Sequence, residues 1–169
     1  MQDYVTGEVR MKISKILITG IAGSGGSYLA EYIYKNHPNV EIHGLAHSRT
    51  NQQNLKNIHT NVKVHNADLM EFGSVLTVLE KVHPDVIFHL AAFFANQNSV
   101  DYPEKDLLVS QLGTIKMLEH AVLMGGVKRF VYAGSGCAIY GAQAPLPLKE
   151  EFVSLHLSTP YQISKMGGE

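Results

Sequence analysis

The feature that most constrains the fold is a glycine-rich turn between a buried apolar run and an amphipathic one. The run Ile16–Thr19 has the length and apolar character of a buried strand, and Gly20, Gly23 and Gly26 follow it at three-residue intervals. Apolar residues then recur at helical spacing as far as Asn36. Such a strand, turn and helix can bring a pyrophosphate close to the unpaired N–H groups at the helix start. The simpler alternative is that the glycines only permit tight packing.

Strands and helices alternate along the rest of the chain. Apolar runs predict strands at residues 16–19, 40–46, 62–65, 85–90 and 129–133. Helical spacing predicts helices that end near residue 36, span 72–82, run from 103 to 124 and begin near 160, with a long functional loop over 141–159. This alternation is typical of an α/β fold, a Rossmann-like, doubly wound parallel sheet in three layers. We expect residues 1–11 to be a loose leader and residues 12–169 to form one domain.

Composition and charge exclude several classes of protein. The 169 residues carry 14 basic and 15 acidic side chains, for a formal net charge of -1, so no positive field attracts nucleic acid or a membrane surface. The apolar runs are too short for a membrane span, and the N-terminus lacks the apolar stretch of a secretory signal. A single cysteine, Cys137, forms no internal disulfide. We therefore expect a cytoplasmic protein, and the nine histidines show no spacing that predicts a metal site.

Thr19 and the three glycines form the pattern Thr-Gly-x-x-Gly-x-x-Gly, which resembles the fingerprint of the extended short-chain dehydrogenase/reductase family. Other segments resemble further motifs of that family, in the same order: Asp68-Leu69, His89-Leu90-Ala91-Ala92, Gly113-Thr114, Tyr140-Gly141 and Tyr161-x-x-x-Lys165. Family members are NAD(P)-dependent epimerases and dehydratases that mostly act on nucleotide sugars. The resemblance implies a dinucleotide-binding Rossmann domain, equivalent to the N-terminal half of a family member, with the C-terminal substrate domain missing.

The resemblance also implies which residues contact the cofactor. They lie in the glycine turn, at the ends of the second, third and fourth strands, and in the last helix. The set is Gly20, Ala22, Gly23, Ser24, Gly25, Gly26, His47, Ser48, Arg49, Asp68, Leu69, Leu90, Ala91, Ala92, Tyr161 and Lys165.

The end of the second strand bears on the choice between NADP and NAD. A carboxylate there would bind the 2′-hydroxyl of the adenosine ribose and repel a 2′-phosphate, but Gly44–Thr50 contains none. It offers His47, Ser48 and Arg49 instead, and a guanidinium pairs well with a phosphate. The segment also resembles the Gly-Leu-x-Arg-Arg stretch of GDP-mannose dehydratases, which use NADP. NADP is therefore favoured over NAD; the alternative is that Arg49 is a solvated loop residue.

Tyr161 and Lys165 are four residues apart, so on a helix they share one face. A nearby ammonium favours a phenolate, which would let Tyr161 exchange a proton with a sugar hydroxyl while hydride moves to or from the nicotinamide. The resemblance implies that Lys165 also holds the nicotinamide ribose. The family's Ser or Thr that assists the tyrosine corresponds here to Gly136, so the neighbouring Ser135 is the candidate; alternatively, Ser135 bonds only backbone.

These residues favour hydride transfer at a sugar carbinol carbon, in a nucleotide-sugar epimerase or a 4-ketosugar reductase. The family's 4,6-dehydratases also need an Asp-Glu pair, and its places hold Cys137 and Ala138, so dehydratase activity is a disfavoured alternative. A third hypothesis is a non-catalytic dinucleotide-binding module. It is supported by Gly136 and by Ser110, where the family usually has asparagine.

Extended family members are about twice as long as this chain, which indicates a truncation. We expect the five-stranded cofactor half to fold and the full-length protein to form a homodimer. We expect the last helix, at roughly nine residues, to be too short to persist alone, because isolated helices need about 12–15. It would be continued in the native protein or held by packing. The 169-residue chain is therefore expected to bind a dinucleotide better than it catalyses.

Overall fold

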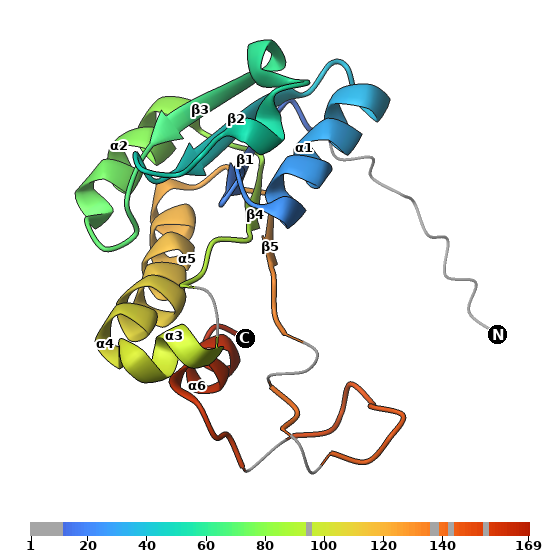
Figure 1. Cartoon of the computed structure of the whole chain (residues 1–169). Coiled ribbons are helices and arrows are strands. Elements are labelled where there is room, and N and C mark those ends of the chain that lie inside the picture. The colour runs from blue at the N-terminus through green and yellow to red at the C-terminus, as the bar shows by residue number, and fades with distance from the viewer. Residues whose placement is uncertain (1–11, 94–95, 136–138, 142–143, 154–155) are drawn as a thin grey trace, which may run out of the picture.

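Five parallel strands form one sheet in the computed structural model, which describes residues 12–93, 96–135, 139–141, 144–153 and 156–169. The strands are β1 (Lys15–Thr19), β2 (Glu41–Ala46), β3 (Val62–Asn66), β4 (Val86–His89) and β5 (Arg129–Tyr132). Their order across the sheet is β3-β2-β1-β4-β5 (Figure 1). The strand order reverses next to β1, since β2 and β3 follow it on one side and β4 and β5 lie on the other. Sheets of this kind bind ligands at this switch point, beyond the carboxyl ends of the strands.

Helices cover both faces of the sheet and give the three layers that the sequence predicts (Figure 1). One core lies between the sheet and α1 (Ser24–Asn36), and it includes Ile16 and Ile18 of β1. The other lies between the sheet and the helices α2 (Phe72–Val82) and α5 (Gly113–Met124), and it includes Leu17. Alternate residues of β1 serve different cores because successive side chains of a strand point to opposite faces.

The helical segments differ in detail from the sequence prediction. The expected helix over 103–124 consists of α4 (Pro103–Asp106), a π-helical segment (Leu107–Leu112) and α5. A short helix that the sequence did not predict, α3 (Asn96–Asp101), precedes them. Short 3₁₀ turns at Gln53–Leu55 and His59–Asn61 occupy the polar stretch before β3. The last helix, α6 (Pro160–Met166), has seven residues rather than the expected nine or so. Among the described residues of 141–159 there is no helix or strand, in agreement with the predicted loop.

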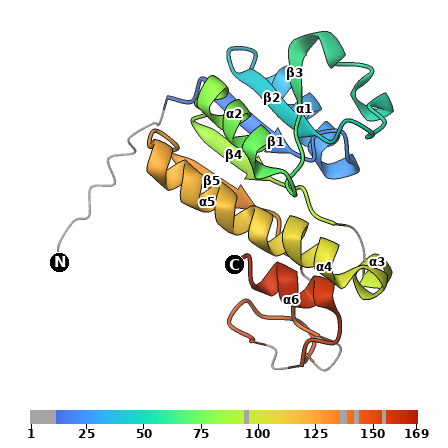
Figure 2. The same cartoon turned by 90° about the vertical axis from the view of Figure 1, so that its left-hand side faces the viewer.

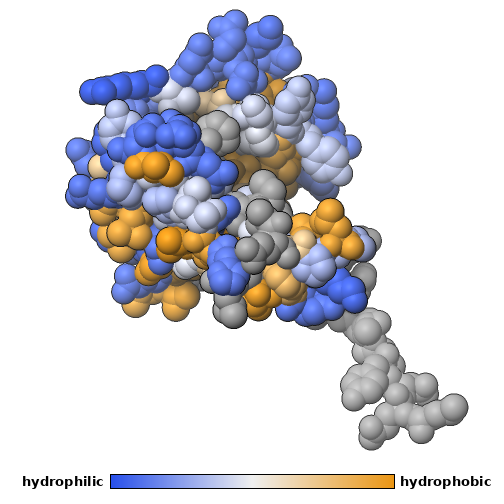
Figure 3. All heavy atoms as spheres, turned by 60° about the horizontal axis from the view of Figure 1, so that its bottom comes forward, coloured by the Kyte–Doolittle hydropathy of each residue, from blue (hydrophilic) through white to orange (hydrophobic). Residues whose placement is uncertain are grey.

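The apolar stripe that predicts the long helix faces outward in the structure. Thr114 and Met117 are fully buried against the sheet, whereas Ile115, Leu118 and Val122 are 46%, 37% and 79% exposed. Figure 2 shows α5 running along the sheet toward α4, with α6 beside that end. Figure 3 views the end of the molecule that carries α3, α4 and α6, and it shows further hydrophobic side chains at the surface.

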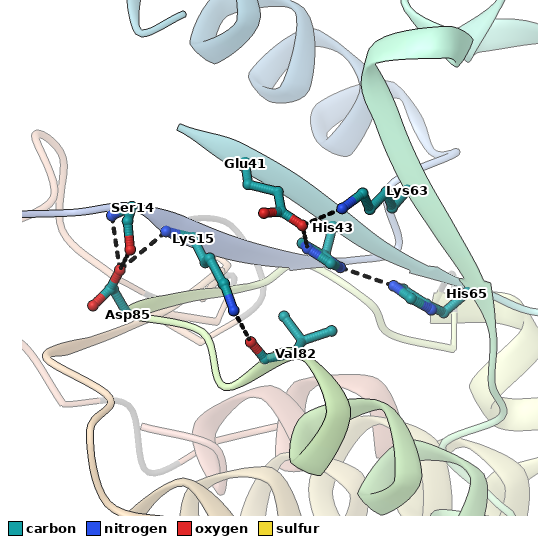
Figure 4. A network of polar contacts seen from close by, with 8 residues as sticks. All are labelled: Ser14, Lys15, Glu41, His43, Lys63, His65, Val82 and Asp85. Atoms are coloured by element: carbon teal, nitrogen blue, oxygen red, sulfur yellow. Dashed lines mark hydrogen bonds and ion pairs between the residues drawn. The ribbon is translucent and has the colours of Figure 1, made fainter. Parts of the chain in front are cut away.

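Asp85 braces the amino edge of the sheet by joining the starts of β1 and β4 (Figure 4). It accepts hydrogen bonds from Lys128 Nζ at 2.6 Å and from the Ser14 and Lys15 N–H groups at 2.7 and 3.0 Å. These donors, Lys128 foremost, hold the pKa of Asp85 far below its usual range. A carboxylate with several donors is strongly stabilised in its charged form.

A second polar cluster ties the edge strand β3 to β2 (Figure 4). His43 Nε2 lies 2.7 Å from Glu41 Oε1, and His43 Nδ1 lies 2.9 Å from His65 Nε2. Lys63 also pairs with Glu41. Burial lowers the pKa of both histidines, so both rings are neutral. The Nε2–H of His65 then donates to His43 Nδ1, and the Nε2–H of His43 donates to Glu41.

Among the described residues, no helix combines the length and apolar character required to cross a lipid bilayer.

Candidate functional site

The glycine turn lies at the carboxyl end of β1, beside the loop that follows β4. Gly20 has a φ of +67°, and a Cβ there would lie 3.1 Å from the Cα of Ala91. At Gly26, a Cβ would overlap the Gly20 carbonyl and lie 2.7 Å from the Cα of Ile21. Both positions therefore require glycine, because any side chain would push the turn away from β4 or from α1.

The start of α1 is open to solvent. Gly23, Ser24 and Gly25 are exposed, and the helix cap is Gly23, which has no side chain to occupy the first-turn N–H groups. Ala22 differs from its neighbours, since it is buried in the core and its carbonyl accepts a hydrogen bond from Asn54 Nδ2 at 2.9 Å. The role of Asn54 in bracing the turn was not predicted; its only sequence signal is a polar residue in an ambiguous segment.

A buried hydrogen-bond chain beneath the turn joins three of the motifs found in the sequence. Thr19 Oγ1 accepts hydrogen bonds from the N–H groups of Leu90 and Ala91 at 3.1 and 3.0 Å. It lies 2.9 Å from His89 Nδ1, and His89 Nε2 lies 3.0 Å from Thr114 Oγ1. The Thr114 hydroxyl donates to a backbone carbonyl at 2.7 Å, so we assign the ring proton of His89 to Nε2.

Burial lowers the pKa of His89 to about 4. The ring is fully buried and neutral near pH 7, and both of its nitrogens have partners. Through these partners, His89 links β1, β4 and α5. The chain fixes the backbone of Leu90 and Ala91 beside the glycine turn, and both residues, like Ala92, are half-buried there.

A pocket of about 260 Å³ lies between the loops that follow β2 and β3. The predicted residues His47, Ser48, Arg49 and Asp68 all line it, together with Glu71. His47 Nε2 lies 3.4 Å from Asp68 Oδ2, across the pocket. The structure thus brings together residues that are about twenty positions apart in the sequence.

Leu69 is placed differently from its neighbour Asp68. Its side chain belongs to the core beneath α2 and α5, and its Cβ lies 3.3 Å from where a Cβ of Gly113 would stand. Gly113 therefore allows α5 to approach the loop after β3 closely. This packing gives Leu69 a structural role and leaves any cofactor contact of Leu69 as a prediction.

Local sequence explains how α6 positions the predicted catalytic residues. Thr159 caps the helix by accepting a hydrogen bond from the Gln162 N–H at 3.3 Å, and Pro160 occupies the first turn. The Tyr161 N–H donates to Ser99 Oγ of α3 at 3.1 Å. Thus α3, which the sequence did not predict, anchors the start of α6.

Lys165 reaches from α6 to the carboxyl end of β5. It is 3% exposed, its Nζ donates to the Ala133 carbonyl at 2.7 Å, and Nζ lies 4.9 Å from the ring centre of Tyr132 and 5.9 Å from that of Tyr161. Burial lowers the pKa of Lys165, and the charge of Asp106 opposes that shift. Burial also raises the pKa of Tyr132 to about 12, so Tyr132 stays protonated at this position.

Ser135 is half-buried and lies two residues beyond the carbonyl that binds Lys165, so both candidates belong to the same loop. Its own carbonyl accepts a hydrogen bond from the Ile139 N–H at 3.1 Å. Gly136, Cys137 and Ala138, on which the predictions about the assisting hydroxyl and the dehydratase depend, lie outside the described residues.

Ser110, where the family usually has asparagine, is almost fully buried. Its Oγ accepts a hydrogen bond from the Phe93 N–H at 2.9 Å and donates to Asp106 Oδ1 at 3.2 Å. Ser110 therefore still ties the loop after β4 to the helix. The buried carboxylate of Asp106 was missed at the sequence level, because nothing in the pattern distinguishes it from exposed acids of the same segment.

A larger pocket, of about 370 Å³, is lined by residues of β5, α5 and the C-terminal end, including Tyr132 and Gly168. None of the predicted cofactor or catalytic residues lines it. We therefore place the site at the carboxyl ends of the strands, where the predicted residues converge, rather than in the larger pocket.

Comparison with known proteins places the chain in a family. Residues 16–169 match the NAD dependent epimerase/dehydratase family. The chain belongs to this family, as the motifs of the sequence indicated, and its fold is the Rossmann-like fold of the family's solved structures.

Two curated relatives carry different activities. The chain is 31% identical to a UDP-glucose 4-epimerase of Mycolicibacterium smegmatis over 92% of its own length and 49% of the relative's. It is also 31% identical to a GDP-mannose 4,6-dehydratase of Vibrio cholerae, over 89% and 42% of the respective lengths. The chain thus spans somewhat less than half the length of each.

Two solved structures show the same arrangement. An epimerase from Methanothermobacter thermautotrophicus is 41% identical, with a TM-score of 0.83, over 93% of this chain and 46% of that one. A Thermus thermophilus UDP-glucose 4-epimerase, solved in complex with NAD, is 28% identical with a TM-score of 0.80, over 91% and 48% of the two chains.

Proposed function

We propose that this chain is the cofactor-binding half of a nucleotide-sugar epimerase or 4-ketosugar reductase. The observation that carries the proposal is the placement of Tyr161 and Lys165. They lie on one face of α6, with the ammonium of Lys165 buried at the carboxyl end of β5. This is the edge of the sheet at which the glycine turn opens. Family membership and the 4-epimerase relative support the same assignment.

The residues of the glycine turn fit a dinucleotide. Gly20 and Gly26 form a cradle that any Cβ would fill, and the exposed first turn of α1 offers N–H groups and the positive end of its dipole to a pyrophosphate. His47, Ser48, Arg49 and Asp68 would surround the adenosine, and Leu90, Ala91 and Ala92 would border the nicotinamide side. When bound, the nicotinamide would accept or donate a hydride at the sugar carbon.

Tyr161 and Lys165 supply the proton chemistry in this proposal. The ammonium of Lys165, 5.9 Å from the Tyr161 ring centre, favours the phenolate, so that Tyr161 can take a proton from a sugar hydroxyl and return it. The carbonyl of Ala133 holds this ammonium in place at 2.7 Å. Ser135, on the same loop, is the proposed donor to the reacting oxygen.

For the cofactor, we propose a nicotinamide dinucleotide with NADP favoured over NAD. Arg49 lines the pocket at the end of β2, where it can pair with a 2′-phosphate. NAD stays the alternative, since the Thermus relative was solved with NAD.

We also propose a nucleotide-sugar substrate and, for the full-length protein, a homodimer in the cytoplasm. The exposed apolar face of α5, with Ile115, Leu118 and Val122, supports burial against another copy. A 4,6-dehydratase is the alternative activity, supported by the Vibrio relative and opposed by Cys137 and Ala138 at the places of the acid pair.

Binding and turnover separate these possibilities. NADPH is titrated against the chain by fluorescence, and its oxidation with 4-keto nucleotide sugars is then followed at 340 nm. Tight binding with slow turnover that Tyr161→Phe abolishes is the expected result. Binding without any turnover contradicts the enzyme and favours the non-catalytic module.

A further inference from the structure

Asp106 is a buried acid that the proposed mechanism does not use. It is fully buried at the end of α4, whereas Glu104 and Lys105 in the same turn are exposed. Its Oδ1 accepts a hydrogen bond from Ser110 Oγ at 3.2 Å, and its Oδ2 is buried without a hydrogen-bond partner among the described residues. Burial of a carboxylate costs free energy unless another group compensates its charge. A compensating charge is therefore expected in the surrounding structure.

The backbone turns Asp106 inward at the start of an irregular helical segment. The π-helical stretch Leu107–Leu112 follows it directly, and turns of this kind often occur at functional sites. Asp106 and Ser110 are both buried, while Leu107 is 49% exposed. Both α4 and the π-helical stretch pack against α6, the helix that carries Lys165 (Figure 2). Since Asp106 is the buried residue of α4, its side chain lies inside the packing of these helices.

Hydrogen bonds and ring contacts connect Ser110 to Lys165. The Thr114 hydroxyl donates to the Ser110 carbonyl at 2.7 Å and lies 3.0 Å from His89 Nε2. The ring of His89 stacks on that of Tyr132, with 6.1 Å between the ring centres. Lys165 Nζ lies 4.9 Å from the centre of the Tyr132 ring. The carboxylate that Ser110 binds and the ammonium of Lys165 therefore belong to one buried polar layer.

Lys165 has no direct counter-ion in the described part of the chain. Its Nζ donates to a neutral backbone carbonyl, and none of the ion pairs there includes it. The titratable groups that face it are His89 of β4, Tyr132 of β5, Tyr161 of α6 and Asp106 of α4. Asp106 is the acid in this set. Burial lowers the pKa of Lys165, and the charge of Asp106 raises it.

We propose that Asp106 is a positioning residue of the candidate site, whose buried negative charge keeps the side chain of Lys165 in its ammonium form beside Tyr161. The inference rests on the proposed function, because it gives Asp106 the task of supporting the ammonium that activates Tyr161. Asp106 acts through Lys165 and not on the substrate. Charges inside a layer that excludes water act over longer distances than charges at the surface, because solvent and salt screen them less.

The first measurement follows the protonation of Lys165 by NMR in the 169-residue chain, with carbon-13 in its lysine side chains. Lys165→Met identifies the signal by its absence, and the midpoint of its titration is compared between the wild type and Asp106→Asn. The amide keeps the shape of the side chain and an acceptor for Ser110, but it has no charge. The midpoint should therefore lie at a lower pH in Asp106→Asn.

Two matched variants separate the charge of Asp106 from its other roles. Glu104→Gln removes an exposed acid of the same helix, and its titration midpoint should equal that of the wild type, because water screens that charge. Ser110→Ala removes the hydrogen bond to Asp106 and keeps the carboxylate, so its midpoint should stay closer to the wild type than to Asp106→Asn. Circular dichroism checks that each variant is folded.

A double variant covers the case in which Asp106→Asn does not fold. Loss of one member of a buried charge pair leaves the other uncompensated, whereas removal of both does not. Asp106→Asn combined with Lys165→Met should then fold and melt at a higher temperature than Asp106→Asn alone. A double variant that is no more stable than Asp106→Asn overturns the inference.

Turnover provides a second readout, with NADPH and 4-keto nucleotide sugars. Near pH 9, Asp106→Asn should lower kcat about tenfold with an unchanged KM, less than the hundredfold or more expected for the acid–base group itself. The loss should be smaller at pH 7, where more of Lys165 stays charged. A loss of equal size at both pH values indicates a structural role only and overturns the inference.

The titration gives results that are independent of activity. Equal midpoints in the wild type and Asp106→Asn overturn the inference and leave the proposed function intact. An equal fall of the midpoint in Glu104→Gln also overturns it. A lower midpoint in Asp106→Asn, in a chain that shows no turnover, supports the effect of Asp106 on Lys165 and contradicts the proposed function.

Discussion

The two halves of the sheet, β1 to β3 and β4 with β5, position their candidate residues by different means. On the side of β1, β2 and β3, the glycine turn and the pocket at His47 depend on the absence of side chains and on exposed polar groups. On the side of β4 and β5, the corresponding residues are buried and interlocked: His89 and Thr114 are fully buried and Lys165 nearly so. In the proposed function, the first group would serve as an open cradle for a charged ligand, and the second would fix a few side chains for proton chemistry.

This difference has a consequence for substitutions. An added methyl group in the glycine turn should destabilise the fold by steric overlap. Around β4, β5 and α6, the loss of a single polar atom should have the larger effect on turnover or stability. Substitutions that leave the fold intact but remove one function are expected mainly on the side of β4, β5 and α6. The following predictions test that division, from the largest expected effect to the smallest.

Replacement of Tyr161 by phenylalanine should lower turnover at least a hundredfold, the typical contribution of a general acid or base. Binding of NADPH should be unchanged within twofold, because the ring is kept and the hydroxyl faces substrate in the proposed mechanism. Stopped assays at 340 nm and fluorescence titration measure the two quantities. Tyr102→Phe, at a residue 55% exposed, is the matched control, and equal losses in both variants would contradict the assignment.

Gly26→Ala should destabilise the fold by about 3 kcal/mol, the cost of overpacking a tight site. The new Cβ would overlap the Gly20 carbonyl oxygen and lie 2.7 Å from the Ile21 Cα, and these two contacted atoms belong to the backbone rather than to a flexible side chain. Gly25→Ala is its control, since a Cβ there meets nothing within 4 Å. Thermal unfolding followed by circular dichroism compares the pair. Similar melting temperatures for the two variants would show that the cradle does not need the close contact.

His89 should make the fold sensitive to mild acid. Its folded pKa of about 4 lies below the ordinary value of 6.5, so the unfolded chain binds more protons between these values and stability falls as the pH falls. We expect the free energy of unfolding to drop by about 2 kcal/mol between pH 7 and pH 5 from this group. Urea unfolding at both pH values measures it.

The His89→Gln variant, which keeps a donor and an acceptor, should lose that part of the pH dependence. The smaller contributions of His43 and His65, whose pKa values burial also lowers, should persist in it. An unchanged pH dependence would show that His89 does not carry the effect.

Asp85→Asn lies at the amino edge of the sheet, away from the candidate site, and serves as a reference for the variants of both halves of the sheet. We expect a loss of about 1 kcal/mol, because an amide oxygen still accepts hydrogen bonds but loses the charge that pairs with Lys128. The lowered pKa of Asp85 means that its contribution is complete above pH 4 and is lost as the pH falls further. Chemical unfolding of both proteins at pH 7 and pH 3 checks that the stability difference between them shrinks as the pH falls. An altered NADPH affinity of the variant would show that Asp85 is coupled to the candidate site.

Much of the architecture could be predicted from the sequence because local patterns carry it. Short apolar runs mark the five strands, and the boundaries of α2 follow directly from its spacing. The long helix shows where this reasoning fails. Its apolar stripe predicted a buried face, yet the buried residues are Ser110, Gly113, Thr114, Met117 and Ala121. Close packing against the sheet and a buried hydrogen-bond chain selected small and polar side chains there.

In the candidate site too, some features follow from the sequence and others only from the tertiary structure. By itself, the sequence determined the glycine turn, the Tyr161–Lys165 pair and the family, because these depend on residue type at fixed spacing. Only the tertiary structure decided the partners that lie far apart along the chain: Thr19 with His89 and Thr114, His47 with Asp68, and Lys165 with the carbonyl of Ala133. The physical reason is that hydrogen bonds and charge pairs depend on distances of about 3 Å, which parallel strand pairing sets between segments that no local pattern relates.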